Sequence, residues 1–327
     1  MIRLLWRTDI HNSDQSPVSR VDDWPETIAH KLVEVGDIAN ANDCDAVIDG
    51  GDFWNDKTPI RTSHQIVSRT IRIHRRYHCP VYCTPGNHDL RLAQLDNLLE
   101  NPLESLFASN TFYRLYDEHE AIIEKDGVKV RVVGIPYHGP RYDLDRFRAI
   151  ERGDEDWLLC SAHVLASPKG GEMFKGEDII RYSDLLDLAP DVDCWMFGHW
   201  HKNQGIEEIA DGKYVVNVGS LTRGSLTQDN IDRKPGVVLM TFWSADHNMP
   251  PKLEFVPITI RPAKDVFDMD KRVKEEARAM TVDAFVESVK KELQTKSKES
   301  FKDIVHKMDT VPFKVREKTI EYIENAR

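Results

Sequence analysis

The sequence predicts an α/β protein in which two mixed β-sheets are stacked on each other and flanked by helices. This is a four-layer αββα sandwich, and a small helical appendage follows it at the C-terminal end. Strand-like and helix-like segments alternate over the first two-thirds of the chain, and hairpin-like strand segments lie in the middle. From about Asp268 onward the chain is charged and helix-like, without a strand pattern.

The alternating segments predict a mostly parallel sheet covered by helices. Strands are expected at 2–9, 45–52 and 79–89, with helices at 23–43 and over the basic segment 61–78. In folds of this kind ligands collect at the carboxyl ends of the strands. The polar residues that follow each strand are therefore candidates for a functional site.

A second sheet, stacked on the first, is predicted from hairpin-like segments rich in β-branched and aromatic residues. These segments lie at 128–139, 156–164, 191–201, 213–220 and 236–243.

We assign residues 1–263 to one domain and 264–327 to a helical region that serves as a capping or partner-docking segment. Within this region, apolar residues recur at the spacing of one helix face, and a last helix is expected at 311–327. The apolar residues are Phe301, Ile304, Val305 and Met308. Packing on the protein's own domain and docking on a partner both explain this stripe.

The net charge of −11 argues against a general binder of polyanions, although bound metal ions can neutralise clustered acidic residues. No apolar run is long enough to cross a bilayer, and the N-terminal residues lack a signal-peptide pattern. A soluble, cytoplasmic protein without a membrane partner is therefore expected. The cysteines are five in number and lack zinc-ribbon spacing, which favours buried, reduced thiols.

Two segments leave alternatives open. The window 61–78 holds arginines without an acidic residue, and it is either a solvated helix surface or a face for phosphates. The leucine-rich segment near 90–110 either joins two copies of the chain in a homodimer or belongs to the core.

Polar residues follow five strand-like segments, and most of them are flanked by glycine. In chain order they are Asp9, His11, Asp52, Asn87, His88, Asp89, His163, His199 and His201. Each motif alone is weak, because Asp52 also suits a helix N-cap and a lone buried His163 is more often a core histidine. Carboxylate, imidazole and carboxamide ligands together suit Mn²⁺, Fe²⁺ or Zn²⁺. The number of ligand-capable residues fits two ions that share a bridging carboxylate.

The ordered series Asp-x-His, Gly-Asp, Gly-Asn-His-Asp, a single His and Gly-His-x-His resembles the motif series of the calcineurin-like metallophosphoesterases. It runs from Asp9 to His201 and covers most of the first domain. Within that superfamily the chain is most similar to the SbcD/Mre-type DNA repair exonuclease subunits. The blocks "SAHVLAS", "FGHWHK" and "VVNVGSLTRGS" carry this finer resemblance.

The resemblance implies two divalent metal ions, with Mn²⁺ as first choice and Fe²⁺ or Zn²⁺ as alternatives. One ion would be held by Asp9, His11 and His201, the other by Asn87, His163 and His199, and Asp52 would bridge them. A hydroxide between the ions would be the nucleophile. His88 would give a proton to the leaving oxygen, and Asp89 would orient His88.

One position departs from the repair nucleases, where a histidine that helps to position the phosphate is expected three residues after the bridging aspartate. Here that position is Asn55, which can donate a hydrogen bond but cannot transfer a proton. Arg223 and His138 lie in glycine-containing loops and are further candidates for substrate contact, with plain loop surface as the alternative. Trp54 and Trp200 either stack on a base or pack against the sheet.

Three functions follow from these observations. The first is a metal-dependent DNA exonuclease or endonuclease, with DNA as substrate and an SbcC-type ATPase docked on the C-terminal helices as partner. The second is a phosphoesterase that acts on small phosphodiesters, cyclic nucleotides or phosphoproteins. The third is a scaffold without catalysis, which the complete ligand set disfavours.

Overall fold

The computed structural model describes residues 1–57, 62–169, 176–244 and 249–270. The chain divides into two compact units, Met1–Phe267 and Asp268–Arg327. Phe267 is buried, and the centroid of its ring lies 5.1 Å from Cζ of Arg20. This contact places Phe267 in the first unit. The predicted apolar stripe of Phe301, Ile304, Val305 and Met308 lies outside the described residues. The predicted last helix at 311–327 lies outside them as well.

Within the described residues, the first sheet orders its six strands β14-β13-β1-β2-β3-β4. The strands are β1 (Ile2–Arg7), β2 (Ala46–Asp49), β3 (Val81–Cys83), β4 (Tyr113–Arg114), β13 (Gly236–Phe242) and β14 (Lys252–Pro257). Strands β1 to β3 are parallel, as predicted, and β4, which the sequence did not predict, continues the parallel order. The assignment of segment 236–243 to the second sheet is wrong, because β13 pairs antiparallel with β1. Apolar composition predicts a buried strand but does not identify the edge with which it pairs.

The second sheet, again within the described residues, orders its six strands β11-β12-β10-β7-β6-β5. The strands are β5 (Ala121–Lys125), β6 (Val128–Ile135), β7 (Trp157–His163), β10 (Cys194–Gly198), β11 (Gly205–Ala210) and β12 (Lys213–Asn217). The central pairs β6–β7, β7–β10 and β10–β12 are parallel, so the expected hairpins occur only at the two edges. The sheet therefore has its own set of carboxyl strand ends on one side.

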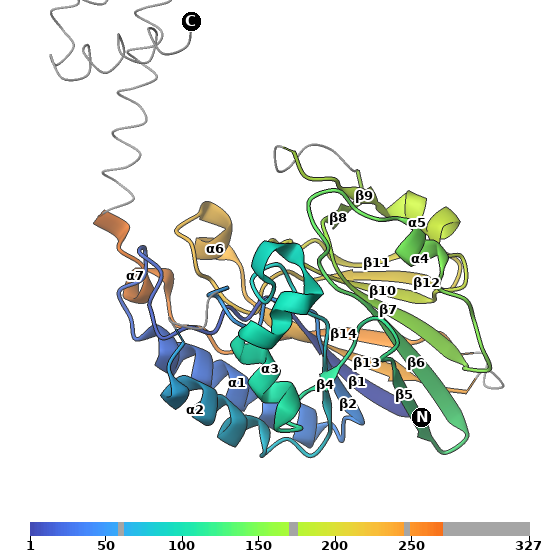
Figure 1. Ribbon diagram of the computed structural model, residues 1–327, viewed down its shortest axis with the longest axis horizontal. Helices are drawn as coiled ribbons and strands as arrows, with labels where there is room; N and C mark the ends of the chain where they lie inside the picture. Colours follow the sequence, from blue (N-terminus) through green and yellow to red (C-terminus); the bar gives the residue numbers. More distant parts are fainter. Residues whose placement is uncertain (58–61, 170–175, 245–248, 271–327) are drawn as a thin grey trace, which may run out of the picture. The chain divides into compact units, whose positions relative to one another are not determined.

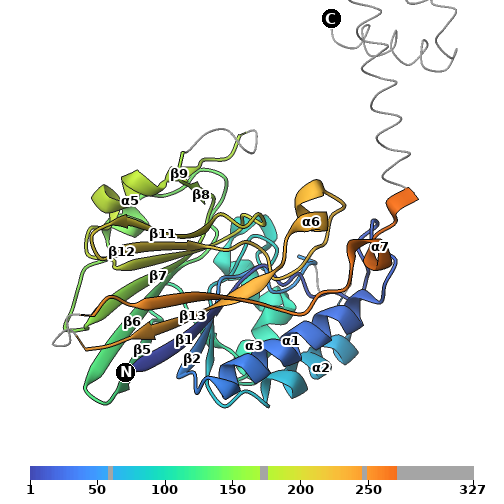
Figure 2. The ribbon, with the colours of Figure 1, turned by 180° about the vertical axis from the view of Figure 1, so that it is seen from behind.

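Helices cover the outer face of each sheet, which completes the predicted four layers (Figures 1 and 2). On the first sheet lie α1 (Trp24–Ala41), α2 (His64–His74) and α3 (Pro102–Ala108), and on the second lie α4 (Asp145–Arg148) and α5 (Tyr182–Leu188). The smaller elements are η2 (Arg91–Ala93), η3 (Leu95–Glu100), β8 (Ala166–Ser167), β9 (Ile180–Arg181), α6 (Gln228–Asp232) and α7 (Ala263–Val266). Among the helices of the described residues, none is both long and apolar enough to cross a membrane.

Strand β1 shows how the layers form, because its two faces are both apolar. Leu5 packs with the helix α1, whereas Leu4 and Trp6 face the core between the two sheets. Alternate residues of a strand point to opposite faces, so a continuous apolar run is buried on both sides. Such a strand must lie at the centre of a layered fold.

Helix α1 begins where the sequence signals it. The side chain of Asp23 accepts a hydrogen bond from the backbone N–H of Glu26 at 3.0 Å, and Pro25 occupies the first turn. Its apolar residues Ile28 and Leu32 face the first sheet.

Both segments for which the sequence left alternatives open contribute buried side chains to the core of the first unit. In α2, Ile66 and Ile73 are buried, whereas Arg72 is exposed. In the leucine-rich segment, Leu103 and Leu106 of α3 are fully buried in the core. Some of its side chains stay outside, since Leu99 is 74% exposed.

A buried ion pair ties the ends of β1 and β2 to α2. Arg7 Nε donates to Asp49 Oδ2 at 2.7 Å, and both side chains are fully buried. The same guanidinium donates to the Tyr77 hydroxyl at 3.1 Å and contacts His74 Nε2 at 2.9 Å. His74 Nδ1 lies 2.8 Å from the Thr70 carbonyl, an acceptor only, so Nδ1 carries the ring proton and Nε2 accepts from Arg7.

Replacing one member of this pair leaves the other charge buried without its partner. We expect Arg7→Leu to lower the free energy of unfolding by about 3–5 kcal/mol, measured by urea denaturation. The double variant Arg7→Leu/Asp49→Leu should lose less than the single variant.

The matched control is Lys125→Ala, which removes a partly exposed ion pair with Asp45 and should cost no more than about 1 kcal/mol. Equal losses for Arg7→Leu and Lys125→Ala would contradict the importance of the buried pair.

Candidate metal centre

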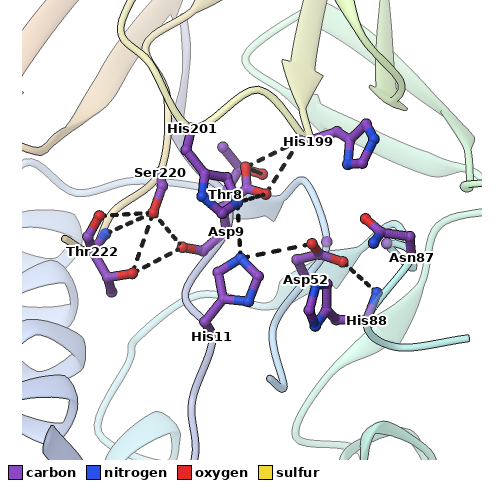
Figure 3. A network of polar contacts seen from close by, with 12 residues as sticks. Thr8, Asp9, His11, Asp52, Asn87, His88, His199, His201, Ser220 and Thr222 are labelled. Atoms are coloured by element: carbon purple, nitrogen blue, oxygen red, sulfur yellow. Dashed lines mark hydrogen bonds and ion pairs between the residues drawn. The ribbon is translucent and has the colours of Figure 1, made fainter. Parts of the chain in front are cut away.

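The polar residues singled out in the sequence meet where carboxyl strand ends of the two sheets come together (Figure 3). Two groups of side chains bring possible ligand atoms within 4.8 Å of one another, and they share Asp52. The first group is Asp9, His11, Asp52 and His201, and the second is Asp52, His163 and His199. These are the two sets that the sequence assigns to the two ions, apart from the amide ligand Asn87.

In the first group, two histidine rings approach each other beside two carboxylates. His11 Nε2 lies 2.9 Å from His201 Nε2 and 3.7 Å from an oxygen of Asp52. His201 Nε2 lies 3.4 Å from an oxygen of Asp9. Two imidazole nitrogens at this separation need a proton or a cation between their lone pairs. The donor set therefore fits a divalent ion.

In the second group, the tautomer of His163 follows from its partners. Its Nδ1 lies 2.7 Å from the carbonyl oxygen of Gly50, which can only accept, so Nδ1 carries a proton. Its Nε2 lies 3.4 Å from Asp52 Oδ1 and 3.2 Å from the amide oxygen of Asn87. In the neutral ring Nε2 therefore carries a lone pair, which lies on the side of the two oxygen ligands. The structure therefore brings Asn87 to the second group.

The electrostatics of the centre depend on buried negative charge. Burial alone would raise the pKa of Asp9, but the hydrogen bond and charge of His201 lower it to about 2. Burial also opposes the ionised form of Asp52, yet His163 holds its pKa well below the usual range. In return Asp52 outweighs burial and raises the pKa of His163 to about 9. Both carboxylates are ionised at neutral pH, which suits the binding of cations.

Four of the candidate ligands adopt a left-handed backbone that non-glycine residues rarely use. The φ angles are 53° for Asp9, 50° for His11, 51° for Asp52 and 80° for His199. Each such residue costs on the order of 1–2 kcal/mol. Hydrogen bonds between the loops hold the first three, since Asp9 N–H donates to the Gly51 carbonyl and His11 N–H to the Asp52 carbonyl, both at 2.9 Å. Strain of this kind concentrates at functional sites.

Close packing around the centre also requires glycine at two positions. A Cβ at Gly86 would lie 2.3 Å from Asp52 Oδ1 and 2.6 Å from His163 Cε1. A Cβ at Gly198 would lie 2.6 Å from the Gly50 carbonyl oxygen. The loops that carry the ligands meet only because these side chains are missing.

The orientation of His88 differs from the prediction. Its Nδ1 lies 2.7 Å from the backbone carbonyl of Asn55, and its ring is 4.8 Å from that of His11. Among the described residues, Asp89 instead accepts hydrogen bonds from backbone N–H groups of both loops. The donors are Phe53 at 3.3 Å, Trp54 at 3.1 Å and Gly86 at 3.0 Å. Asp89 therefore joins two loops, and the carbonyl of Asn55 orients His88.

The other candidates for substrate contact are engaged in loop structure. Arg223 is buried and donates to the carbonyls of Asn230 and Arg261 at 3.3 and 2.6 Å. His138 uses both ring nitrogens, at 2.9 Å from the Pro136 carbonyl and 2.9 Å from the N–H of Asp143.

The tryptophans beside the motifs are both buried, with 0% of Trp54 and 8% of Trp200 exposed. Packing, the alternative to base stacking, therefore accounts for both side chains.

Three functional contacts were not foreseen. Ser220 Oγ donates to the carbonyl of Asp9 at 2.8 Å, and Thr8 Oγ1 donates to its carboxylate at 2.8 Å (Figure 3). His199 Nε2 lies 2.8 Å from Glu177 Oε1. Thr8 and Ser220 follow strands and were within reach of the strand-end rule, whereas Glu177 lies in no motif that the sequence offered.

Comparison with known proteins gives a family match over more than half of the chain. A family model described as calcineurin-like phosphoesterase matches residues 2–203. No curated protein matches the sequence.

Solved structures that match this chain include a dimetal phosphatase from Danio rerio, 12% identical with a TM-score of 0.46, over 73% of this chain and 92% of that chain. NAD nucleotidase from Haemophilus influenzae is 13% identical with a TM-score of 0.48, over 79% of this chain and 56% of that chain. A purple acid phosphatase from yellow lupin (Lupinus luteus) seeds is 14% identical with a TM-score of 0.48, over 78% of this chain and 51% of that chain.

A side chain at Gly86 is expected to disrupt ion binding without unfolding the protein. Gly86→Ala should weaken Mn²⁺ binding by about 10- to 100-fold, the range found when groups that orient metal ligands are altered. Isothermal titration calorimetry measures the effect, and thermal unfolding of the metal-free protein checks the fold.

Gly224→Ala is the matched control, because a Cβ there meets its nearest neighbour at 3.8 Å, an ordinary contact. If Gly86→Ala binds Mn²⁺ as Gly224→Ala does, the packing argument for the centre is wrong.

Proposed function

The chain belongs to the calcineurin-like phosphoesterase family, and from this premise we propose that it is a metal-dependent phosphodiesterase that cleaves DNA, like the SbcD/Mre-type nucleases it resembles. The observation that carries the proposal is the pair of ligand groups that share Asp52. A bridged pair of sites is the arrangement that assists in-line displacement at phosphorus.

Two divalent ions held by these side chains would supply Lewis-acid activation of water and of the phosphoryl oxygens. We propose Mn²⁺ as the ion, because the ligands are oxygen and imidazole nitrogen without thiolate. Asp9, His11 and His201 would hold one ion, and Asn87, His163 and His199 the other. The chain's own contribution is to place these ligands around the shared Asp52.

His88 is the proposed proton donor to the leaving oxygen. The carbonyl of Asn55 only accepts, so Nδ1 of His88 carries its proton and Nε2 is the nitrogen free to take up and release another. The ring is half-buried beside His11 and so borders the first ligand group. Any residue at position 55 offers the same carbonyl. The asparagine found there is thus compatible with proton transfer by His88.

DNA as substrate is supported by the openness of the centre to solvent. The His201 side chain is 48% exposed, and His88 and Asn87 are half-buried, so a polymer can approach the ligands. The arginines of α2 do not contribute to this support. Arg69 pairs with Glu26 at 2.6 Å, and the exposed Arg72, Arg75 and Arg76 lie toward the end of α2 that leads into β3. That end is at the edge of the sheet opposite the carboxyl strand ends.

A phosphoesterase that acts on small phosphodiesters, cyclic nucleotides or phosphoproteins is the second candidate. The same centre would serve it, and the net charge of −11 favours a substrate less charged than DNA. An SbcC-type ATPase partner for the C-terminal helices and a homodimer remain further proposals.

The substrate class is tested with the full-length, Mn²⁺-loaded protein on end-labelled single- and double-stranded DNA, with and without candidate ATPases. We expect metal-dependent cleavage that a chelator abolishes. Hydrolysis of p-nitrophenyl esters or cyclic nucleotides with both DNA substrates intact would instead establish the second candidate. Fewer than two transition-metal ions per chain would contradict the dinuclear centre itself.

The roles of two residues are separated by their metal content. His88→Ala should keep both ions and lose about 100- to 10,000-fold in turnover, the usual contribution of a positioned acid or base. Asp52→Ala should lose bound metal as well as turnover, because it contributes to both ligand groups. Elemental analysis and cleavage rates provide the measurements, and loss of metal in His88→Ala would refute its assignment.

A further inference from the structure

The ring of His199 contacts a carboxylate that belongs to neither ligand group. Its Nε2 lies 2.8 Å from Glu177 Oε1, and the two side chains are only 14% and 15% exposed. Glu177 is absent from the groups whose ligand atoms lie within 4.8 Å of one another. It therefore stands behind His199 and outside the cluster that would surround the ions.

The Glu177 carboxylate is held in place by its own partners. The Tyr142 hydroxyl donates a hydrogen bond to the same Oε1 at 3.0 Å. It accepts one from the backbone N–H of Leu165 at 2.8 Å. The carboxylate of the next residue, Asp178, accepts a hydrogen bond from the backbone N–H of Tyr142 at 3.1 Å. The backbone N–H of Asp178 donates to the Pro140 carbonyl at 2.9 Å. A carboxylate anchored in this way can fix the position of a histidine ring.

The contact also fixes the tautomer of His199. An ionised carboxylate is an acceptor only, so Nε2 must carry the proton in this hydrogen bond. In the neutral ring Nδ1 is then the nitrogen with a free lone pair. The backbone of His199 is held separately, because its N–H donates to Asp9 at 3.1 Å. Backbone and ring are thus fixed from two sides.

We propose that Glu177 is a positioning residue of the metal centre, which holds His199 in the tautomer and orientation that present Nδ1 to the ion shared with Asp52 and His163. This inference rests on the proposed function, since it assumes a metal ion in the second group. A carboxylate partner fixes the tautomer of a ligating histidine and raises its basicity. Tyr142 extends the arrangement by orienting the carboxylate.

Metal binding tests the proposal without any measurement of cleavage. In full-length protein titrated with Mn²⁺, Glu177→Ala should bind one ion as the wild type does and the other about 10- to 100-fold more weakly. Glu177→Gln keeps an acceptor oxygen and should recover much of the lost affinity. The control Asp187→Ala removes an exposed acidic residue of α5 and should leave both ions unaffected.

A tautomer measurement separates a positioning role from general structural damage. In ¹⁵N long-range correlation spectra of the metal-free protein, His199, assigned with the variant His199→Gln, should show the Nε2–H form. Glu177→Ala should lose this pattern while the other histidines keep theirs.

Equal affinity for both ions in Glu177→Ala and Asp187→Ala, or an unchanged His199 tautomer, would overturn the proposal. If Glu177→Ala does not fold, Glu177→Leu, which also removes the acceptor, provides the same comparison, and wild-type affinity and tautomer in this variant would overturn the proposal. A wild type that binds two ions but leaves DNA intact would refute the proposed nuclease and not this role of Glu177.

Discussion

Two buried carboxylates, Asp9 and Asp52, lie at the carboxyl ends of neighbouring parallel strands, and the cost of burying both negative charges is the constraint on which the site depends. Neither is more than 1% exposed, and burial by itself would raise the pKa of each carboxyl. Buried charges without compensation are costly, so positive charge must be supplied locally. The surrounding histidines supply part of it, and divalent ions would supply the rest. The ligand groups, the glycines and the strained loops all follow from this requirement.

Convergence of so many polar side chains on one small volume has a cost in backbone conformation. Asp9, His11 and Asp52 adopt left-handed φ angles, and Gly86 lacks the Cβ that would strike Asp52. Such conformations persist only when the surrounding structure determines them. Here the apolar cores on both faces of β1 provide that support, together with the buried pair that Arg7 forms with the end of β2.

The charge distribution separates the question of chemistry from that of substrate. The centre is suited to phosphoester hydrolysis by its ligands, whereas the exposed arginines of α2 lie toward the opposite edge of the first sheet. The basic segment 61–78 in the sequence therefore does not indicate where a substrate would approach the centre. The openness around His201 is the feature that permits a large substrate.

The sequence by itself determined the layered α/β fold, because strand periodicity is a local signal, and polar residues at strand ends marked the candidates for the centre. It did not determine that β13 pairs with β1, since apolar composition is the same for either sheet. The partners of His88 and His199 were also decided by tertiary structure alone. Asn55 acts through a backbone carbonyl that every residue possesses, and Glu177 reaches His199 from a segment without a motif. Contacts of this kind depend on how distant loops meet, which no local pattern encodes.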